Sequence, residues 1–123
     1  KTLVKSLKKP NIFYYIGDED LSLKESEFAD FFDDRKATLL TIRKLAQLTD
    51  CTIIPCINIY DKSSGKYITY LEDTVTDFPS DSPSKDARTI NSCFERLISR
   101  SVNQYMWSLR IFQNREKGKN YPY

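Results

Sequence analysis

The amino-acid sequence predicts an α/β fold, with a mixed sheet flanked by helices. Two stretches with apolar residues at helical spacing, 37–50 and 85–100, alternate with three β-rich runs at 12–16, 52–60 and 66–71. A short turn-forming segment separates the last two runs, so we expect that part of the sheet to be antiparallel. The chain has 123 residues, which is room for one domain.

The composition indicates a folded chain and disfavours several functions. Hydrophobic residues make up 40% and charged residues 29%, and the formal charge of +2 is too small to argue for nucleic-acid binding. No run reaches the 18 or so apolar residues that a membrane span needs. The sequence holds no His and three Cys without a paired motif, so we expect free thiols, no metal site and no cofactor. Because the first residue is Lys and not Met, we expect a piece of a longer chain.

An acidic cluster follows the first predicted strand. The run Ile12–Ile16 is almost continuously apolar, which is typical of a strand covered on both faces. Gly17 ends it, and Asp18, Glu19 and Asp20 come next. Ligands of open α/β sheets bind at the carboxyl ends of strands, so this cluster is a candidate site. A solvated acidic turn is the simpler interpretation of the same residues.

The other elements follow from periodicity and turn signals. We expect the end of a helix over 1–9 and a long connection over 21–35, held to the domain by its phenylalanines. The helix at 37–50 is expected to use Asp34 or Thr38 as its N-cap. Pro55 predicts a bulge or an edge position in the strand at 52–60.

The second half of the chain carries clearer signals. Residues 61–65 form a turn sequence with Gly65 near its end, and they predict a hairpin between the strands at 52–60 and 66–71. A polar connection over 72–84 leads to the helix at 85–100. An apolar-aromatic run then leads to Arg110 and a polar tail.

The tail resembles the C-terminal signature of bacterial lipid A biosynthesis acyltransferases, the lauroyl and myristoyl transferases. The signature residues are Gln104, Tyr105, Met106, Trp107, Arg110, Phe112, Arg115 and Gly118. Earlier landmarks of the family occur in matching order: Tyr14-Tyr15, Asp18-x-Asp20, Phe28, Phe31-Phe32, Ala37-Thr38 and Asn91. The resemblance covers nearly all of the chain. It implies that residues 1–123 are a single partial domain, the C-terminal portion of a glycerolipid-acyltransferase-like fold.

The resemblance also implies an activity. Enzymes of this family pass an acyl chain from an acyl carrier protein thioester to a hydroxyl group of a lipid A precursor, in lipopolysaccharide biosynthesis. A His-x-x-x-x-Asp/Glu motif in their N-terminal half serves as the base. This chain has no His, so we expect it to be inactive without the missing N-terminal half. The whole enzyme is expected at the cytoplasmic face of the bacterial inner membrane, on the membrane surface.

Four residues carry the site that the resemblance implies. Asp18 and Asp20 match the acidic pair near the family's active site, and we expect Asp18 to orient the catalytic group or the sugar acceptor. Arg110 and Arg115 match basic tail positions and are expected to bind substrate, because a guanidinium binds a phosphate or a carboxylate bidentately. A salt bridge that docks the tail onto the domain is the alternative for Arg110.

The chain departs from the family at several landmarks. It has Gly17 and Leu21-Ser22 around the acidic pair, where the family has Pro and Tyr-Gly. It has Asp33 where the family has Gly, and Leu109 where the family has His. The lost loop glycines make positive φ harder to reach.

Three other functions remain open from the sequence. A related acyltransferase acting on glycerolipids or phosphatidylinositol mannosides would share the fold. A non-enzymatic module could stack single-stranded nucleic acid on its aromatics, but these lie within apolar runs and are not interleaved with Lys and Arg, so no nucleic acid is expected. A non-functional remnant is the third.

Overall fold

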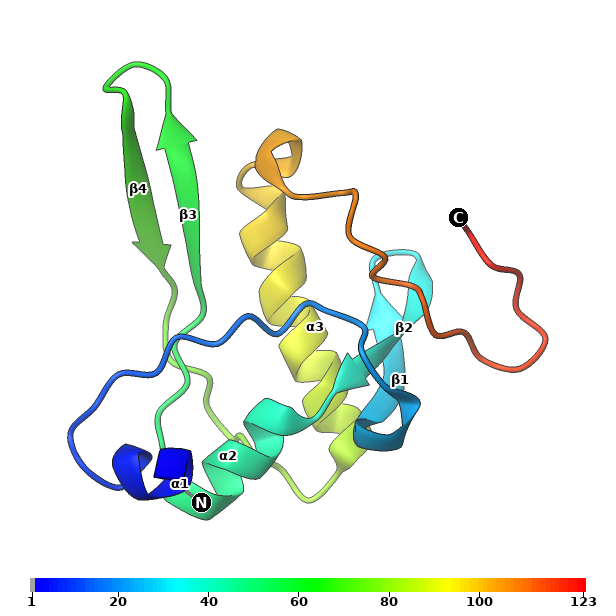
Figure 1. The fold of residues 1–123 in the computed structure, drawn as a ribbon, viewed down its shortest axis with the longest axis horizontal. Helices are drawn as coiled ribbons and strands as arrows, with labels where there is room; N and C mark the ends of the chain where they lie inside the picture. Colours follow the sequence, from blue (N-terminus) through cyan, green and yellow to red (C-terminus); the bar gives the residue numbers. More distant parts are fainter. Residues whose placement is uncertain (1) are drawn as a thin grey trace.

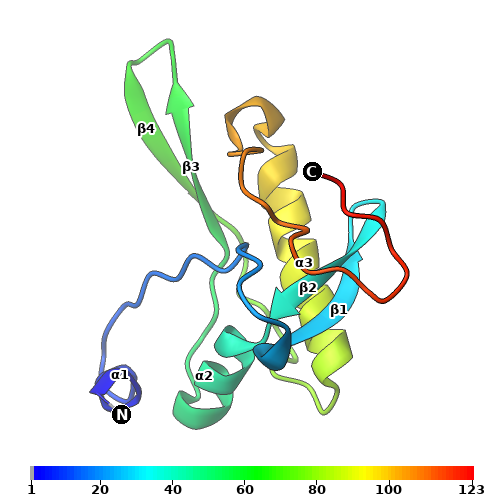
Figure 2. The same cartoon turned by 45° about the vertical axis from the view of Figure 1, so that its right-hand side comes forward.

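The computed structural model describes residues 2–123 and confirms the α/β class (Figure 1). Its longest helix, α3, runs between two β-hairpins, and a helix–loop segment lies at one end of the molecule (Figures 1 and 2). The elements in chain order are α1 (Thr2–Leu7), the 3-10 helix η1 (Leu23–Glu25), β1 (Ser26–Phe31), β2 (Asp34–Leu39), α2 (Thr41–Thr49), β3 (Cys56–Asp61), β4 (Lys66–Leu71), α3 (Pro83–Ser99) and the 3-10 helix η2 (Val102–Gln104).

The strands form two separate antiparallel sheets and not the single mixed sheet that the sequence predicted. β1 pairs with β2, and β3 pairs with β4, each in a two-stranded hairpin. Two-stranded hairpins are marginally stable alone, and packing against a helix stabilises them. The β1–β2 hairpin packs extensively against a helix, because α3 lies along β1. The β3–β4 hairpin contacts α3 much less.

Helix α3 is the best-defined element and begins and ends close to its predicted bounds. The Ser82 hydroxyl accepts a hydrogen bond from Lys85 N at 3.3 Å, and Pro83 occupies the first helical turn, where a missing N–H costs nothing. Its buried stripe faces the sheet and the tail, where Ile98 packs with Phe31 of β1 and Ile111. The tail therefore belongs to the hydrophobic core.

A buried ion pair joins α2 to the start of α3. Asp86 is fully buried and accepts hydrogen bonds from Arg43 Nε at 2.6 Å and from Ser80 N at 2.9 Å. Breaking such a pair from one side leaves an uncompensated buried charge. The sequence did not single out this pair, because its members are 43 residues apart.

The predicted strand Ile12–Ile16 is wrong for the described chain. The segment 11–21 has no regular secondary structure, and none of its backbone groups bonds to another backbone group within residues 2–123. Ile12 is 100% exposed and Tyr14 and Ile16 are more than half exposed, although burial on both faces was expected. An apolar run becomes a strand only where a neighbouring strand pairs with its backbone N–H and C=O groups. No strand among the described residues pairs with this segment.

The predicted connection over 21–35 and the start of the helix at 37–50 are also wrong. These residues form η1 and the β1–β2 hairpin, and α2 begins only at Thr41. In β1 the buried residues Ala29 and Phe31 alternate with the exposed Asp30, as a strand requires. The many carboxylates of this segment made the alternation hard to recognise in the sequence. Neither expected cap is used, because Asp34 and Thr38 lie in β2 and the N-cap residue Leu40 makes no side-chain cap.

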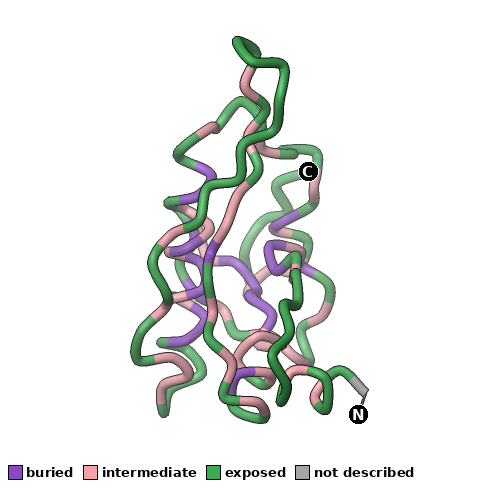
Figure 3. Tube along the Cα trace, turned by 90° about the vertical axis from the view of Figure 1, so that its left-hand side faces the viewer, coloured by how far each residue is buried: buried purple, intermediate pink, exposed green. Residues whose placement is uncertain are grey.

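The β3–β4 hairpin confirms the predicted turn. Gly65 has φ of 67°, a left-handed conformation that glycine reaches without strain. The strand starts at Cys56 and not at Thr52, directly after Pro55. Every residue of β4 is exposed, and the tip of the projecting hairpin is coloured as exposed in Figure 3.

Candidate functional site

Asp18 is a buried carboxylate that contacts the C-terminal tail. Only 9% of the residue is exposed, and its Oδ2 accepts a 2.8 Å hydrogen bond from the Tyr105 hydroxyl. Burial raises the pKa of Tyr105, and the negative charge of Asp18 raises it further, so the phenol stays a donor at neutral pH. The predicted acidic turn is therefore not a solvated one.

Asp20 makes a second connection to the tail. Its Oδ2 accepts from Asn114 N at 2.7 Å and its Oδ1 accepts from Asn114 Nδ2 at 2.6 Å. The residue is 4% exposed, so both bonds form away from bulk water. Bonds to a carboxylate are among the stronger hydrogen bonds in proteins. Asp18 and Asp20 together hold the segment 17–22 against the tail, and we name this arrangement the loop–tail clamp.

Lys36 is a buried cation beside the clamp that the sequence did not reveal. The residue is 1% exposed, and its ammonium group donates to Ala37 O at 3.4 Å and lies 5.9 Å from the centre of the Phe31 ring. Burial lowers the pKa of Lys36, and the negative charges of Asp20 and Asp18 partly oppose that shift. The burial of β2 does not alternate, since its last four residues, from Lys36 to Leu39, are all buried, so no local pattern marks Lys36 as buried.

Thr38 and Asn91 fix α3 to the first hairpin. Thr38 Oγ1 donates to Asn91 Oδ1 at 2.8 Å, and Asn91 Nδ2 donates to the Asp30 carbonyl at 2.9 Å and to the Ala29 carbonyl at 3.3 Å. Both Thr38 and Asn91 are buried. Their role in the structure is to align α3 with β1.

The structure gives the two tail arginines different environments. Arg115 is largely buried: Nη2 donates to Asp34 Oδ2 at 2.6 Å, and the guanidinium lies 5.4 Å from the centre of the Phe112 ring. The Arg35 backbone N–H and the Arg115 guanidinium lower the pKa of Asp34. Arg110 is exposed, and its side chain makes no ion pair or hydrogen bond with residues 2–123. The tail-docking salt bridge that was considered for Arg110 is thus made by Arg115.

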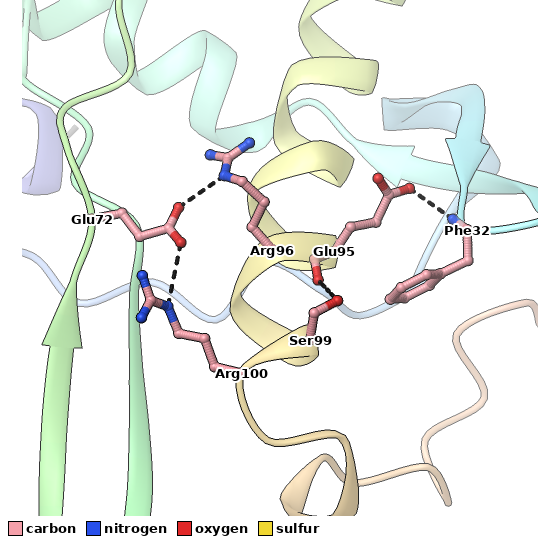
Figure 4. Close-up of a pocket in the computed structure, with 6 residues that line it drawn as sticks. All are labelled: Phe32, Glu72, Glu95, Arg96, Ser99 and Arg100. Atoms are coloured by element: carbon pink, nitrogen blue, oxygen red, sulfur yellow. Dashed lines mark hydrogen bonds and ion pairs between the residues drawn. The ribbon is translucent and has the colours of Figure 1, made fainter.

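Two hollows lie along α3, and the predicted site residues line neither of them. A cavity of about 580 Å³ lies between α3 and the end of β4, and Figure 4 shows Glu72 there between Arg96 and Arg100. Glu72 accepts from Arg96 Nε at 3.1 Å and lies 3.6 Å from Arg100 Nε. A second cavity of about 660 Å³ adjoins it, lined mainly by residues 71–76 and the same helix. Neither is lined by Asp18, Asp20, Arg110 or Arg115.

The arrangement can bind and position, but it holds no complete set of groups for nucleophilic catalysis. The thiols of Cys51, Cys56 and Cys93 are free, and burial raises the pKa of the Cys93 thiol, which makes it a poor nucleophile. Among residues 2–123, no group of three or more acidic or thiol side chains is placed to hold a metal ion.

Comparison with known proteins decides the family. The family described as "Bacterial lipid A biosynthesis acyltransferase" matches residues 1–114. The chain belongs to this family. It is 32% identical to a lipid A biosynthesis acyltransferase of Haemophilus influenzae, over 98% of this chain and 37% of that protein. It is 28% identical to the lipid A biosynthesis myristoyltransferase of Escherichia coli, over 100% of this chain and 38% of that protein.

Another relative of this acyltransferase-family chain is lipid A biosynthesis acyltransferase 2 of Shigella flexneri, 30% identical over 100% of this chain and 40% of that protein. The chain thus spans well under half the length of the curated relatives it matches. No solved structure matches it. No helix in the described part of the chain has both the length and the apolar character needed to cross a membrane.

Proposed function

We propose that the chain is the C-terminal part of an enzyme that moves a fatty acyl chain from an acyl carrier protein thioester to a hydroxyl group of a lipid A precursor. The observation that carries this proposal is the family match over residues 1–114. The names of the relatives include lauroyl-, myristoyl- and palmitoleoyltransferases, all of which act on fatty acyl groups. The enzyme would work at the cytoplasmic face of the inner membrane.

The reaction needs a base that this chain does not contain. As the acceptor oxygen attacks the thioester carbonyl, a base must take the hydroxyl proton, and the carbon–sulfur bond then breaks to release the carrier thiol. Histidine suits that task near neutral pH, and the chain has none. In the proposal, a His-x-x-x-x-Asp/Glu motif in a further portion of the longer chain supplies it. The chain alone would then be inactive.

Exposed apolar surface supports the need for a further portion. The segment 11–21 is extended with no backbone partner among the described residues, and most of its apolar side chains face solvent. Large exposed apolar patches usually mark contact surfaces. In the proposal, strands of the further portion pair with this segment, which would bring the base to the end that carries Asp18 and Asp20.

We propose that Asp18 and Asp20 serve the active site through the loop–tail clamp. Asp18 would orient the catalytic group or the sugar acceptor, and its burial beside Tyr105 supports a fixed geometry. Asp20 would hold the tail through Asn114. Groups that act in catalysis need such support from neighbouring hydrogen bonds.

We assign the two arginines different parts in substrate binding. Arg110 is exposed and unpaired within residues 2–123, so its guanidinium is free to bind a phosphate of the acceptor. Arg115 would contribute by fixing the tail, because its pair with Asp34 already uses the guanidinium.

The experiment uses the longer enzyme that carries this segment, assayed with a phosphorylated and a dephosphorylated acceptor. Replacing Arg110→Gln should raise KM for the phosphorylated acceptor about tenfold or more, and should change KM for the dephosphorylated one little. Lys119→Gln, another exposed basic residue of the tail, is the matched control. Equal effects of Arg110→Gln on both acceptors would contradict the assignment.

A further inference from the structure

One end of the molecule exposes several aromatic and apolar side chains together. Tyr67 is 75% exposed, and its ring lies 5.3 Å from that of Tyr60 on the facing strand. Met106 and Trp107, just after η2, are at least half exposed. We name this surface the aromatic end and define it by Tyr60, Tyr67, Val102, Met106 and Trp107.

The two parts of the aromatic end are joined by direct contacts. The Gln104 side chain accepts from Tyr60 N at 2.8 Å and donates to Tyr60 O at 2.9 Å, which docks η2 on the outer edge of β3. Trp107 Nε1 donates to Val102 O at 2.7 Å, so the indole is held while half of it stays exposed.

The chemistry of this surface fits a lipid bilayer. Tyrosine and tryptophan rings combine an apolar body with a polar group, which is why they gather where a membrane meets water. Lys62 and Lys66 are exposed at the tip of the hairpin and make no ion pair within residues 2–123. Asp61, the acid of that turn, is already bonded to Ser63 and Ser64. Unpaired lysines next to such rings suit anionic head groups.

We infer that the aromatic end is a membrane-contacting surface, with Tyr67, Met106 and Trp107 in the interfacial region of an anionic bilayer and Lys62 and Lys66 at its head groups. The inference takes its setting, a lipid acceptor, from the proposed function. Figures 1 and 2 place the hairpin tip and η2 at one end and α1 at the other. The lysines beside α1 therefore face away from this bilayer.

Trp107 is the only tryptophan of the chain and reports the contact directly. Its fluorescence emission is recorded while phosphatidylcholine vesicles, with or without phosphatidylglycerol, are added. The inference predicts a blue shift and quenching by brominated acyl chains with the anionic vesicles, and a much weaker response with the neutral ones. Added salt should weaken the binding, because it screens exposed charges.

Variants and matched controls locate the contact. Tyr67→Ser should weaken vesicle binding about tenfold. Lys62→Gln and Lys66→Gln should each weaken it about fivefold. Leu48→Ser, at an apolar residue of α2 that is more than half exposed, and Lys8→Gln with Lys9→Gln should not change it. Circular dichroism confirms that each variant is folded.

Three results would overturn the inference: no response of Trp107 to anionic vesicles, equal losses in the control variants, or burial of Trp107 by self-association without lipid. None of them bears on acyl transfer. Transfer by the longer enzyme with detergent-dispersed substrates tests the proposed function separately, and Tyr67→Ser should leave that rate unchanged.

Discussion

The Tyr105 hydroxyl donates a 2.8 Å hydrogen bond to the Asp18 carboxylate, across 87 residues of chain. Asp20 and Asn114 make the parallel connection nine residues further along the tail. The acidic segment and the tail, each of which matches a landmark of the acyltransferase family, thus form one structural unit. The tail packs into the α3–β1 core, where Ile111 contacts Phe31 and Ile98.

Removing the phenol should weaken the clamp. Tyr105→Phe is expected to lower the free energy of unfolding by about 1–3 kcal/mol, because the buried Asp18 carboxylate loses its donor. Urea denaturation followed by circular dichroism measures the change. Tyr14→Phe is the control, since Tyr14 is exposed and should lose nothing measurable. Equal stability of the two variants would mean that the Tyr105–Asp18 bond does not form.

Removing the second carboxylate should release the tail. Asp20→Ala is expected to cost about 1–3 kcal/mol, because the Asn114 backbone N–H and side-chain amide lose their acceptor. Asp81→Ala removes an exposed carboxylate and should change stability by less than about 0.5 kcal/mol. Hydrogen exchange of the Asn114 amide measures the local effect: it should become faster in Asp20→Ala and stay slow in Asp81→Ala.

Lys36 should make stability depend on pH in the alkaline range. Burial lowers the pKa of Lys36 in the folded chain below its usual 10.5, so folding releases a proton between those two values. The contribution to stability is fully present above the unfolded pKa and is lost as pH falls through the folded pKa. The wild-type chain should therefore gain stability relative to Lys36→Met as pH rises through that window. A constant difference between the two proteins would contradict the burial of the ammonium group.

Replacing Arg115 and replacing Arg110 should have different effects on the pKa of Asp34. Arg115→Gln is expected to raise the pKa of Asp34 toward its usual value, although the Arg35 backbone N–H would still hold it somewhat low. Arg110→Gln should leave the pKa of Asp34 unchanged, because Arg110 does not contact it in the described chain. Carbon-detected NMR of the Asp34 carboxyl group follows both. A shift in Arg110→Gln would show that the tail lies differently.

The sequence predicted those elements whose signals are local. Ser82 and Pro83 mark the start of α3, and Gly65 marks the hairpin turn, because capping and positive φ depend on the residues themselves. The strand at 12–16 failed because pairing depends on a neighbour and not on apolar content alone. The β1–β2 hairpin was missed because most of its exposed residues, Glu27, Asp30 and Asp33, are acidic, which made the segment resemble a loop.

For the candidate site, too, the sequence revealed the residues with a local signal and missed those that depend on distant contacts. Asp18 and Asp20 stood out because they follow an apolar run, and the structure places both in one buried arrangement. Their partners Tyr105 and Asn114 are roughly 90 residues away, and no local pattern reports such a contact. A lone lysine within a strand gives no sign that it is buried, so Lys36 was found only in three dimensions.

The most direct test of the account is acyl transfer from an acyl carrier protein thioester to a lipid A precursor, measured for the 123-residue chain and for the longer chain that carries it. The account predicts no turnover by the 123-residue chain and turnover by the longer one, with loss of activity when the His of its His-x-x-x-x-Asp/Glu motif is replaced by Ala. Turnover by the 123-residue chain alone would contradict it.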